Sequence, residues 1–313
     1  MGVLALLWGS GFLWIKLALS HGLTPQQITV VRCVLGAAVL LALAWWGGQR
    51  LPRDLAIWGR LVVAAFFCNA LPFLLFGIGE QTVDSGVAGV LNATTPLWSL
   101  VIGAVLGTER GDALHPVRLG GLLLGFGGTV LIFAPWEQTG LLTGGAVALL
   151  AAAVSYAVAF AYMDRALTGS GTPPVALSAA QLMTASALSA LALPVGGGPA
   201  PVHVDATALI AVTVLGILGT GVTFHLNYRL IADEGATSAA TVGYLLPVVS
   251  VALGALVLDE RIGLRGLAGI VAVLVGVAMT RKHGSRSGRG RPGPGRQDGG
   301  TRRSRHVSAA SPS

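Results

Sequence analysis

Residues 88–110 read AGVLNATTPLWSLVIGAVLGTER, and residues 239–261 read AATVGYLLPVVSVALGALVLDER. The two stretches align at an offset of 151 residues, with a proline, a glycine and a Glu-Arg pair at matching places. Other residues repeat at an offset of 148: Trp8 aligns with Tyr156, Phe12 with Phe160, Trp14 with Tyr162, and Gly128 with Gly276. Self-similarity over half the chain indicates two copies of one structural unit.

The composition places both copies in lipid. Of the 313 residues, 53% are hydrophobic and 11% are charged, whereas a soluble domain carries about a quarter charged residues. Apolar runs recur along the chain, and about 20 apolar residues cross a bilayer as a helix. We place spans at 3–20, 26–46, 58–79, 84–107, 116–134, 141–163, 174–194, 207–230, 235–258 and 263–280.

The predicted fold is an all-α membrane protein with ten transmembrane helices, built as two five-helix repeats over residues 1–134 and 141–280. Because five is an odd number, the second repeat enters the membrane from the opposite side, so the repeats are inverted. Secondary transporters use this geometry for alternating access around a site near the midplane. The first apolar run is expected to be retained, because no basic region precedes it and no small-residue cleavage site promptly follows it.

The net charge of +7 comes from the last segment of the chain. Nine of the 20 Lys and Arg residues and one acid follow Thr280, which leaves eleven bases and twelve acids before it. We interpret residues 281–313 as a disordered basic cytoplasmic tail beside anionic lipid. No nucleic-acid partner is expected, since no aromatic residue lies among the arginines. Outside the tail, seven basic residues flank one side of the predicted bundle and two flank the other, which predicts both termini in the cytoplasm.

Several motifs resemble the EamA-type family of the drug/metabolite transporter superfamily. They are the opening Trp8-Gly9-Ser10-Gly11-Phe12, Arg32 early in the second helix, the paired prolines, and the Glu-Arg after the fourth and ninth helices. The resemblance covers residues 1–280. It implies ten helices, inverted repeats, a central cavity between the halves, and export or exchange of amino acids, metabolites or drugs. The basic tail is not part of the family pattern.

Charged side chains are costly inside a bilayer, about 2.5–3.5 kcal/mol at a helix centre on insertion scales. Lys16 and Arg32 are therefore candidate functional residues. Both lie in the predicted outer halves of their helices, where Glu80 and Asp84 also lie. Either the two cations reach toward the surface and pair with these acids, or one of them is the counter-charge for a substrate carboxylate.

Polar residues at the estimated midplane form the candidate substrate cavity. An amide or hydroxyl group in hydrocarbon needs a partner helix or a wet cavity, so an interhelical hydrogen bond is the alternative role for each. The residues are Asn69, Asn92, Thr94, Thr95, Tyr156, Thr220 and Tyr244. The repeated aromatic residues either pack in the core or line the same cavity, which adds Trp14 to the candidates.

Pro96 and Pro247 each remove a backbone donor within the fourth helix of their repeat. A kink at equivalent depth in both halves suits a gate or a discontinuous-helix site, and a kink without any gating role is the alternative. His225 in the eighth span is a candidate for proton coupling, against a purely structural role. Since the sequence places no acid firmly inside a span, uniport and exchange stay open.

The sequence holds no H-E-x-x-H, G-x-S-x-G or P-loop motif, so neither metal hydrolysis nor ATP use has a template. We expect no catalytic residue, metal or cofactor, and we expect Cys33 and Cys68 to be packing residues. The predicted function is secondary transport of small metabolites, amino acids or drug-like compounds by alternating access, as an exporter or exchanger. A channel-like pore is the alternative, and a membrane-embedded enzyme has no motif to support it.

The expected partners are a small-molecule substrate and membrane lipid, with a homodimer as an additional expectation. The chain is rich in Gly, Ala, Leu, Val and Arg, which is typical of a bacterial genome of high GC content. The sequence therefore predicts a multi-pass protein of a bacterial inner membrane.

Overall fold

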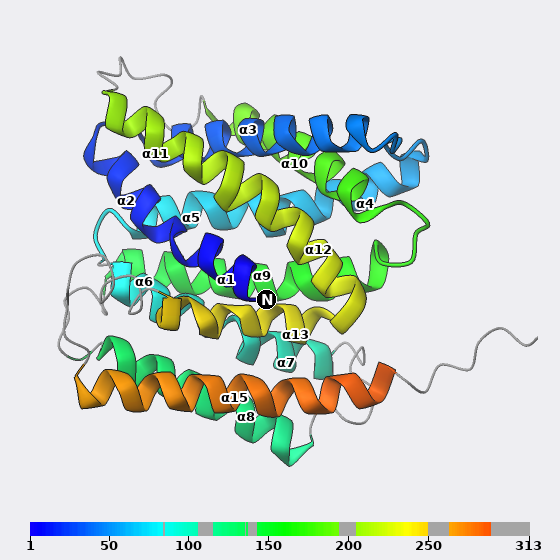
Figure 1. The fold of residues 1–313 in the computed structure, drawn as a ribbon. Helices are drawn as coiled ribbons and strands as arrows, with labels where there is room; N and C mark the ends of the chain where they lie inside the picture. The colour runs from blue at the N-terminus through cyan, green and yellow to red at the C-terminus, as the bar shows by residue number, and fades with distance from the viewer. Residues whose placement is uncertain are drawn as a thin grey trace, which may run out of the picture.

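The computed structural model describes residues 1–83, 85–105, 115–134, 136, 143–193, 205–249 and 263–288. Within these ranges the regular structure is helical, and no strand occurs in them. Figure 1 shows the helices lying alongside one another as a single bundle.

The described elements fall into two sets, one in each half of the chain. The first half holds α1 (Gly2–Gly9), α2 (Gly11–Ser20), α3 (Pro25–Trp46), α4 (Leu55–Ala65), the π-helical segment η1 (Phe66–Ala70), α5 (Leu71–Gly79), α6 (Ser85–Asn92), α7 (Thr95–Val105) and α8 (Pro116–Phe133). The second half holds α9 (Gly144–Ala166), α10 (Pro174–Ala192), α11 (Ala206–Gly216), the π-helical segment η4 (Ile217–Val222), α12 (Thr223–Glu234), α13 (Ala236–Ala240), the 3-10 segment η5 (Thr241–Tyr244) and α15 (Leu264–Gly288).

Seven described segments are long and apolar enough to cross a membrane: Gly2–Ser20, Pro25–Trp46, Leu55–Gly79, Ala88–Val105, Gly144–Ala166, Pro174–Ala192 and Ala206–Glu234. Three shorter apolar helices cover Leu119–Ile132, Ser238–Val249 and Leu264–Thr280, where the remaining spans are predicted. The chain is therefore an all-helical, multi-pass membrane protein, and the count of ten spans stays a prediction. Because α15 continues to Gly288, the first residues of the predicted basic tail are helical.

Local sequence signals explain where several helices begin. At the start of α3, the Thr24 hydroxyl accepts a hydrogen bond from the backbone N–H of Gln27, and the Gln27 side chain accepts one from the backbone N–H of Thr24. This capping box satisfies two free donors of the first turn, and Pro25 has no donor to lose. Asp54 and Asp205 cap α4 and α11 with their carboxylates.

The described parts of the two halves repeat the same irregularities. The π-helical segments η1 and η4 begin 151 residues apart, at Phe66 and Ile217. The fourth helix of the first half is interrupted at residues 93–94, between α6 and α7, and the 3-10 segment η5 interrupts the corresponding helix of the second half. Pro96 and Pro247 each follow the interruption of their half within three residues. π-Helical turns are rare overall, and those that occur are frequently at functional sites. The matched positions of η1 and η4 therefore make the region between the halves a candidate functional region.

The fifth helices of the two halves, α8 and α15, pack closely along one side of the bundle (Figure 1). Glycines permit this approach, because a Cβ atom added to Gly276 would lie 2.5 Å from the backbone oxygen of Gly121. Gly128 and Gly269 meet in the same way, at 2.8 Å. Small residues at a helix contact let backbones approach and gain van der Waals packing, which is the main attraction between helices in lipid.

Candidate functional site

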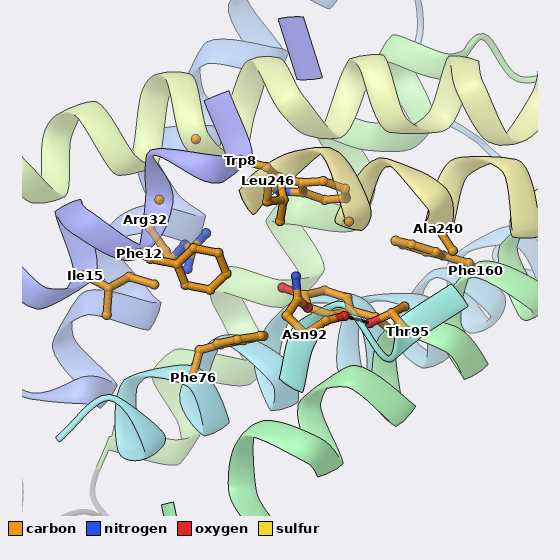
Figure 2. A pocket seen from close by; sticks show the side chains of 14 residues that line it. Trp8, Phe12, Ile15, Arg32, Phe76, Asn92, Thr95, Phe160, Ala240 and Leu246 are labelled. Carbon is orange, nitrogen blue, oxygen red and sulfur yellow. Dashed lines mark hydrogen bonds between the residues drawn. The ribbon is translucent and has the colours of Figure 1, made fainter. Parts of the chain in front are cut away.

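A cavity lies between the two halves, with about 600 Å³ of empty space including its mouth. Both halves contribute side chains, and Figure 2 shows them converging on the same space. The lining residues are Trp8, Gly11, Phe12, Ile15, Arg32, Phe76, Asn92, Thr95, Tyr156, Phe160, Gly219, Ala240, Gly243 and Leu246.

Five aromatic rings form a continuous wall of the cavity. Phe12 contacts Phe76 with ring centroids 5.8 Å apart, and Phe76 contacts Tyr156 at 5.9 Å. Tyr156 contacts Phe160 at 5.9 Å, and Phe160 is stacked with Trp8 at 6.3 Å. Aromatic rings prefer such spacings. The wall is suited to binding the flat or apolar body of a small molecule.

Arg32 brings a positive charge to this cavity from α3. Its Nε donates a hydrogen bond to the Thr220 hydroxyl at 3.1 Å, and its guanidinium carbon lies 3.6 Å from the centroid of the Phe73 ring. No carboxylate forms an ion pair with Arg32 among the residues that the structure describes. A hydroxyl group and a ring face therefore hold the cation in place, so its charge is available to a ligand.

Asn92 and Thr95 lie where the fourth helix of the first half is broken. The Thr95 hydroxyl donates to the Asn92 carbonyl at 2.7 Å, and the Thr94 hydroxyl donates to the Leu91 carbonyl at 2.6 Å. These hydrogen bonds satisfy two backbone carbonyl groups near the break. Inside a membrane, backbone groups that leave the regular helix need such partners within the protein. Across the cavity, a Cβ atom on Gly243 of η5 would lie 4.0 Å from the Asn92 carbonyl oxygen. The two interrupted helices thus meet at the cavity.

Among the polar contacts between the halves that the structure describes, two occupy matching positions. The first is the Arg32–Thr220 bond; in the second, Gln181 donates from Nε2 to the Asn69 Oδ1 at 2.7 Å. Arg32 and Gln181 each lie seven residues after the proline that begins α3 or α10. Asn69 and Thr220 are each the fourth residue of a π-helical segment. We call these the Arg32 contact and the Gln181 contact.

Further contacts surround this pair. The Tyr228 hydroxyl donates a hydrogen bond to the Gln181 Oε1. Phe73 and Phe224, which are 151 residues apart, meet edge to face with ring centroids 6.0 Å apart. This contact therefore joins two residues that occupy equivalent positions in the two halves.

The structure places the predicted candidates in three groups. Arg32, Asn92, Thr95 and Tyr156 line the cavity, whereas Asn69 and Thr220 form the inter-half contacts beside it. Outside the described cavity lining are Trp14, Lys16, His225 and Tyr244, together with the buried prolines Pro96 and Pro247. The hydroxyl of Tyr244 and the Nδ1 of His225 are buried without a hydrogen-bond partner.

Lys16 reaches Glu80, one of its two expected acidic partners, through the backbone and not through the carboxyl group. Lys16 donates from Nζ to the backbone carbonyl of Glu80 at 2.9 Å, and the Glu80 carboxyl group is fully buried with both oxygens unpartnered. The acid therefore points into the protein and not toward the surface, because α9 covers the end of α5. Asp84, the other expected partner, lies outside the described residues.

Several residues of the site escaped the sequence prediction. Gln181 could have been found, because Pro174 aligns with Pro25 and so makes Gln181 the counterpart of Arg32. Phe76, Gly219 and Ala240 carry no such signal, since they are ordinary residues of apolar helices. No group of three potential metal ligands occurs among the described residues, and both cysteines are buried and free.

Comparisons with known proteins find a matching family, related sequences and a similar fold. The model of the EamA-like transporter family matches residues 1–134 and 143–281. The uncharacterized transporter YdfC of Bacillus subtilis (strain 168) is 27% identical over 274 residues, which cover 88% of this chain and 87% of the relative. A probable amino-acid metabolite efflux pump of Escherichia coli (strain K12) is 27% identical, with 88% and 91% covered. A solved crystal structure aligns with a TM-score of 0.71 over 91% of this chain and 96% of that chain, and its 22% identity shows a likeness of fold alone.

Proposed function

The chain belongs to the EamA-like transporter family, and we propose that it is a secondary transporter for small carboxylate-bearing molecules with an apolar or aromatic body. It is a membrane transporter and not an enzyme, as the names of its relatives indicate. The observation that carries the substrate class is Arg32, a buried cation that forms no ion pair among the described residues and lines a cavity walled by aromatic rings.

The chemistry of the cavity favours an amphipathic anion or zwitterion. A guanidinium group binds a carboxylate through two parallel hydrogen bonds, and Asn92 and Thr95 supply further polar groups. The aromatic wall accommodates the rest of the molecule. The E. coli relative is named for amino-acid metabolites, which supports amino acids and related acids as the first compounds to test.

Alternating access is the proposed mechanism. Two inverted five-helix repeats have two near-equivalent arrangements, one open to each side of the membrane. Three kinds of matched feature support this view: the π-helical segments, the interruptions of the fourth helices, and the Arg32 and Gln181 contacts. The family model also covers each half. We further propose ten spans, both termini in the cytoplasm, and a bacterial inner membrane as the location, with export or exchange as the direction.

Counterflow in proteoliposomes tests this function. Vesicles holding the purified chain are preloaded with unlabelled L-phenylalanine, and labelled L-phenylalanine is added outside. We expect saturable uptake that excess phenylalanine inhibits and that phenethylamine, which lacks the carboxylate, does not. Arg32→Gln should abolish this discrimination, whereas Arg229→Gln, at an exposed position of α12, should leave it intact. Flux without saturation would instead indicate a channel, and inhibition by both compounds alike would contradict recognition of the carboxylate.

A further inference from the structure

Glu80 is the one buried acid among the residues that the structure describes. It directly follows α5 and the apolar span Leu55–Gly79. Its side chain is fully shielded from solvent, and neither carboxyl oxygen has a hydrogen-bond partner. Removing an ionised carboxylate from water without such partners is costly, and protonation removes that cost.

Two cations oppose this preference. Lys16 approaches from α2 and donates to the backbone carbonyls of Glu80 at 2.9 Å and of Val83 at 3.5 Å, and Arg32 faces the same region from α3. Burial raises the pKa of the Glu80 carboxyl group, while the charges of Lys16 and Arg32 lower it. Burial therefore favours the neutral form of the carboxyl group, and the two neighbouring positive charges favour its ionised form.

The helix that covers Glu80, α9, carries one titratable group of this region, Tyr156, which acts electrostatically on Arg32 and not on the Glu80 carboxyl group. On α9, Leu149 and Gly145 pack against the end of α5, since a Cβ atom on Gly79 would lie 2.5 Å from the Leu149 Cγ and 3.0 Å from the Gly145 carbonyl oxygen. Neither residue carries a charge. Among the described residues around Glu80, the charged groups are thus Lys16 and Arg32.

Glu80 is linked to the cavity through Arg32 and Phe76. Arg32 lines the cavity and also acts electrostatically on the Glu80 carboxyl group. Phe76, which accepts the backbone hydrogen bond of Glu80 at 2.9 Å, belongs to the aromatic wall. An anion bound to Arg32 would offset the positive charge that favours ionised Glu80, so it would favour the protonated carboxyl group.

We propose that Glu80 is a proton-binding site coupled to Arg32, so that an anionic substrate at Arg32 and a proton at Glu80 bind together. The proton comes from water and forms an O–H bond on the carboxyl group, and no electrons are transferred. Because coupling between two sites is reciprocal, acidification strengthens anion binding to the same extent that the anion strengthens proton binding. The substrate half of this proposal rests on the proposed function, and the proton half does not.

Infrared spectroscopy tests the proton half without any substrate. The full chain in detergent is titrated from about pH 4 to about pH 9, a range that covers carboxyl groups shifted upward from their usual pKa. We expect the C=O band of a protonated carboxylic acid to persist above the range of exposed acids. The band should be absent in Glu80→Gln and present in Asp233→Asn, a matched change at an exposed position. A band that persists in Glu80→Gln, or none in the wild type, would overturn the assignment.

A second variant keeps the test decisive if Glu80→Gln does not fold. Lys16→Gln removes one of the two cations that favour the ionised form, so the midpoint of the C=O band should move to higher pH. An unchanged or lower midpoint would contradict the proposal, because it would show that Lys16 does not act on the carboxyl group that titrates.

Proton uptake on binding tests the coupling. L-Phenylalanine is added to the purified chain in weak buffer containing a pH indicator, and we expect uptake of up to about one proton per molecule bound, as linkage requires. Glu80→Gln should bind without this uptake. Binding accompanied by proton release, or by no proton change in the wild type, would refute the coupling. If L-phenylalanine does not bind at all, the proposed function is contradicted for this compound, and the infrared titration still decides whether Glu80 holds a proton.

Discussion

Replacing Gln181 with leucine should open the bundle near Asn69 about eightfold more often. Gln181 donates to Asn69 and accepts from Tyr228, so the substitution removes two buried hydrogen bonds while keeping a side chain of similar size. Polar contacts between membrane helices are worth about 0.6 kcal/mol on average. Two of them give about 1.2 kcal/mol, and since 1.4 kcal/mol is tenfold, the population of the open arrangement should rise about eightfold.

A native cysteine reports this opening. Cys68 precedes Asn69, is fully buried, and lies beside the Gln181 side chain. In a Cys33→Ala background it is the only thiol of the chain, and its modification by N-ethylmaleimide can be followed by mass spectrometry. Where opening and closing are faster than alkylation, the rate tracks the open population. We expect about an eightfold increase in Gln181→Leu.

The control comes from the same helix. The Thr184 hydroxyl donates to the carbonyl of Ala180 at 2.8 Å, so this hydrogen bond lies within α10 and does not join the halves. Thr184→Val should leave the alkylation rate of Cys68 unchanged. An unchanged rate in Gln181→Leu, or an equal increase in Thr184→Val, would refute the idea that the Gln181 contact holds this region closed.

Three further predictions concern the cavity and the packing of the bundle. Arg32→Gln should raise the KM for a carboxylate substrate about 10- to 100-fold, because a hydrogen bond to a charged group is worth about 1.5–3 kcal/mol; counterflow measures this, with Arg229→Gln as the control. Trp8→Leu should raise the same KM several-fold, since aromatic pairs contribute about 0.5–1.5 kcal/mol, and an unchanged KM would exclude the ring from substrate binding. Gly276→Val should destabilise the contact of α8 with α15 by about 1–3 kcal/mol, and the Tm in detergent should fall. Gly127→Ala should leave the Tm unchanged, because the space around Gly127 is open.

The positions of the helices could be predicted from the sequence because a helix that crosses a bilayer needs about 20 mostly apolar residues. A span predicted at 26–46 is found as α3, Pro25–Trp46, and one predicted at 174–194 is found as α10, Pro174–Ala192. The irregular turns could not be predicted in the same way. A π-helical segment such as η1 has the same apolar composition as the helices around it, since only the backbone bonding differs.

The candidate site was predictable in its chemistry and less so in its geometry. Polarity and estimated depth selected Asn92, Thr95 and Tyr156, which do line the cavity. The same criteria selected Tyr244, whose side chain does not belong to the described lining, because the rotation of each helix about its axis decides which way a side chain points. Glu80 shows a further limit: a position at a helix end suggests exposure, but packing by a distant helix buries it.

The difference between the two inter-half contacts explains how a nearly symmetric bundle could respond to a ligand. In the proposed alternating-access mechanism, two matched halves give two arrangements of similar free energy, and a ligand that binds both equally shifts neither. The Gln181 contact joins two neutral side chains, whereas the Arg32 contact includes a charged guanidinium group from a residue that also lines the cavity. An anion that withdraws Arg32 from Thr220 would therefore weaken one contact and leave the other intact.

The alkylation of the two cysteines tests whether the contacts open separately. In a Cys68→Ala background, Thr220→Val should speed the alkylation of Cys33, which adjoins Arg32. In the Cys33→Ala background, the same substitution should leave the alkylation rate of Cys68 unchanged. Equal acceleration of both thiols would show that the contacts open together, and a mechanism in which they alternate would then be wrong.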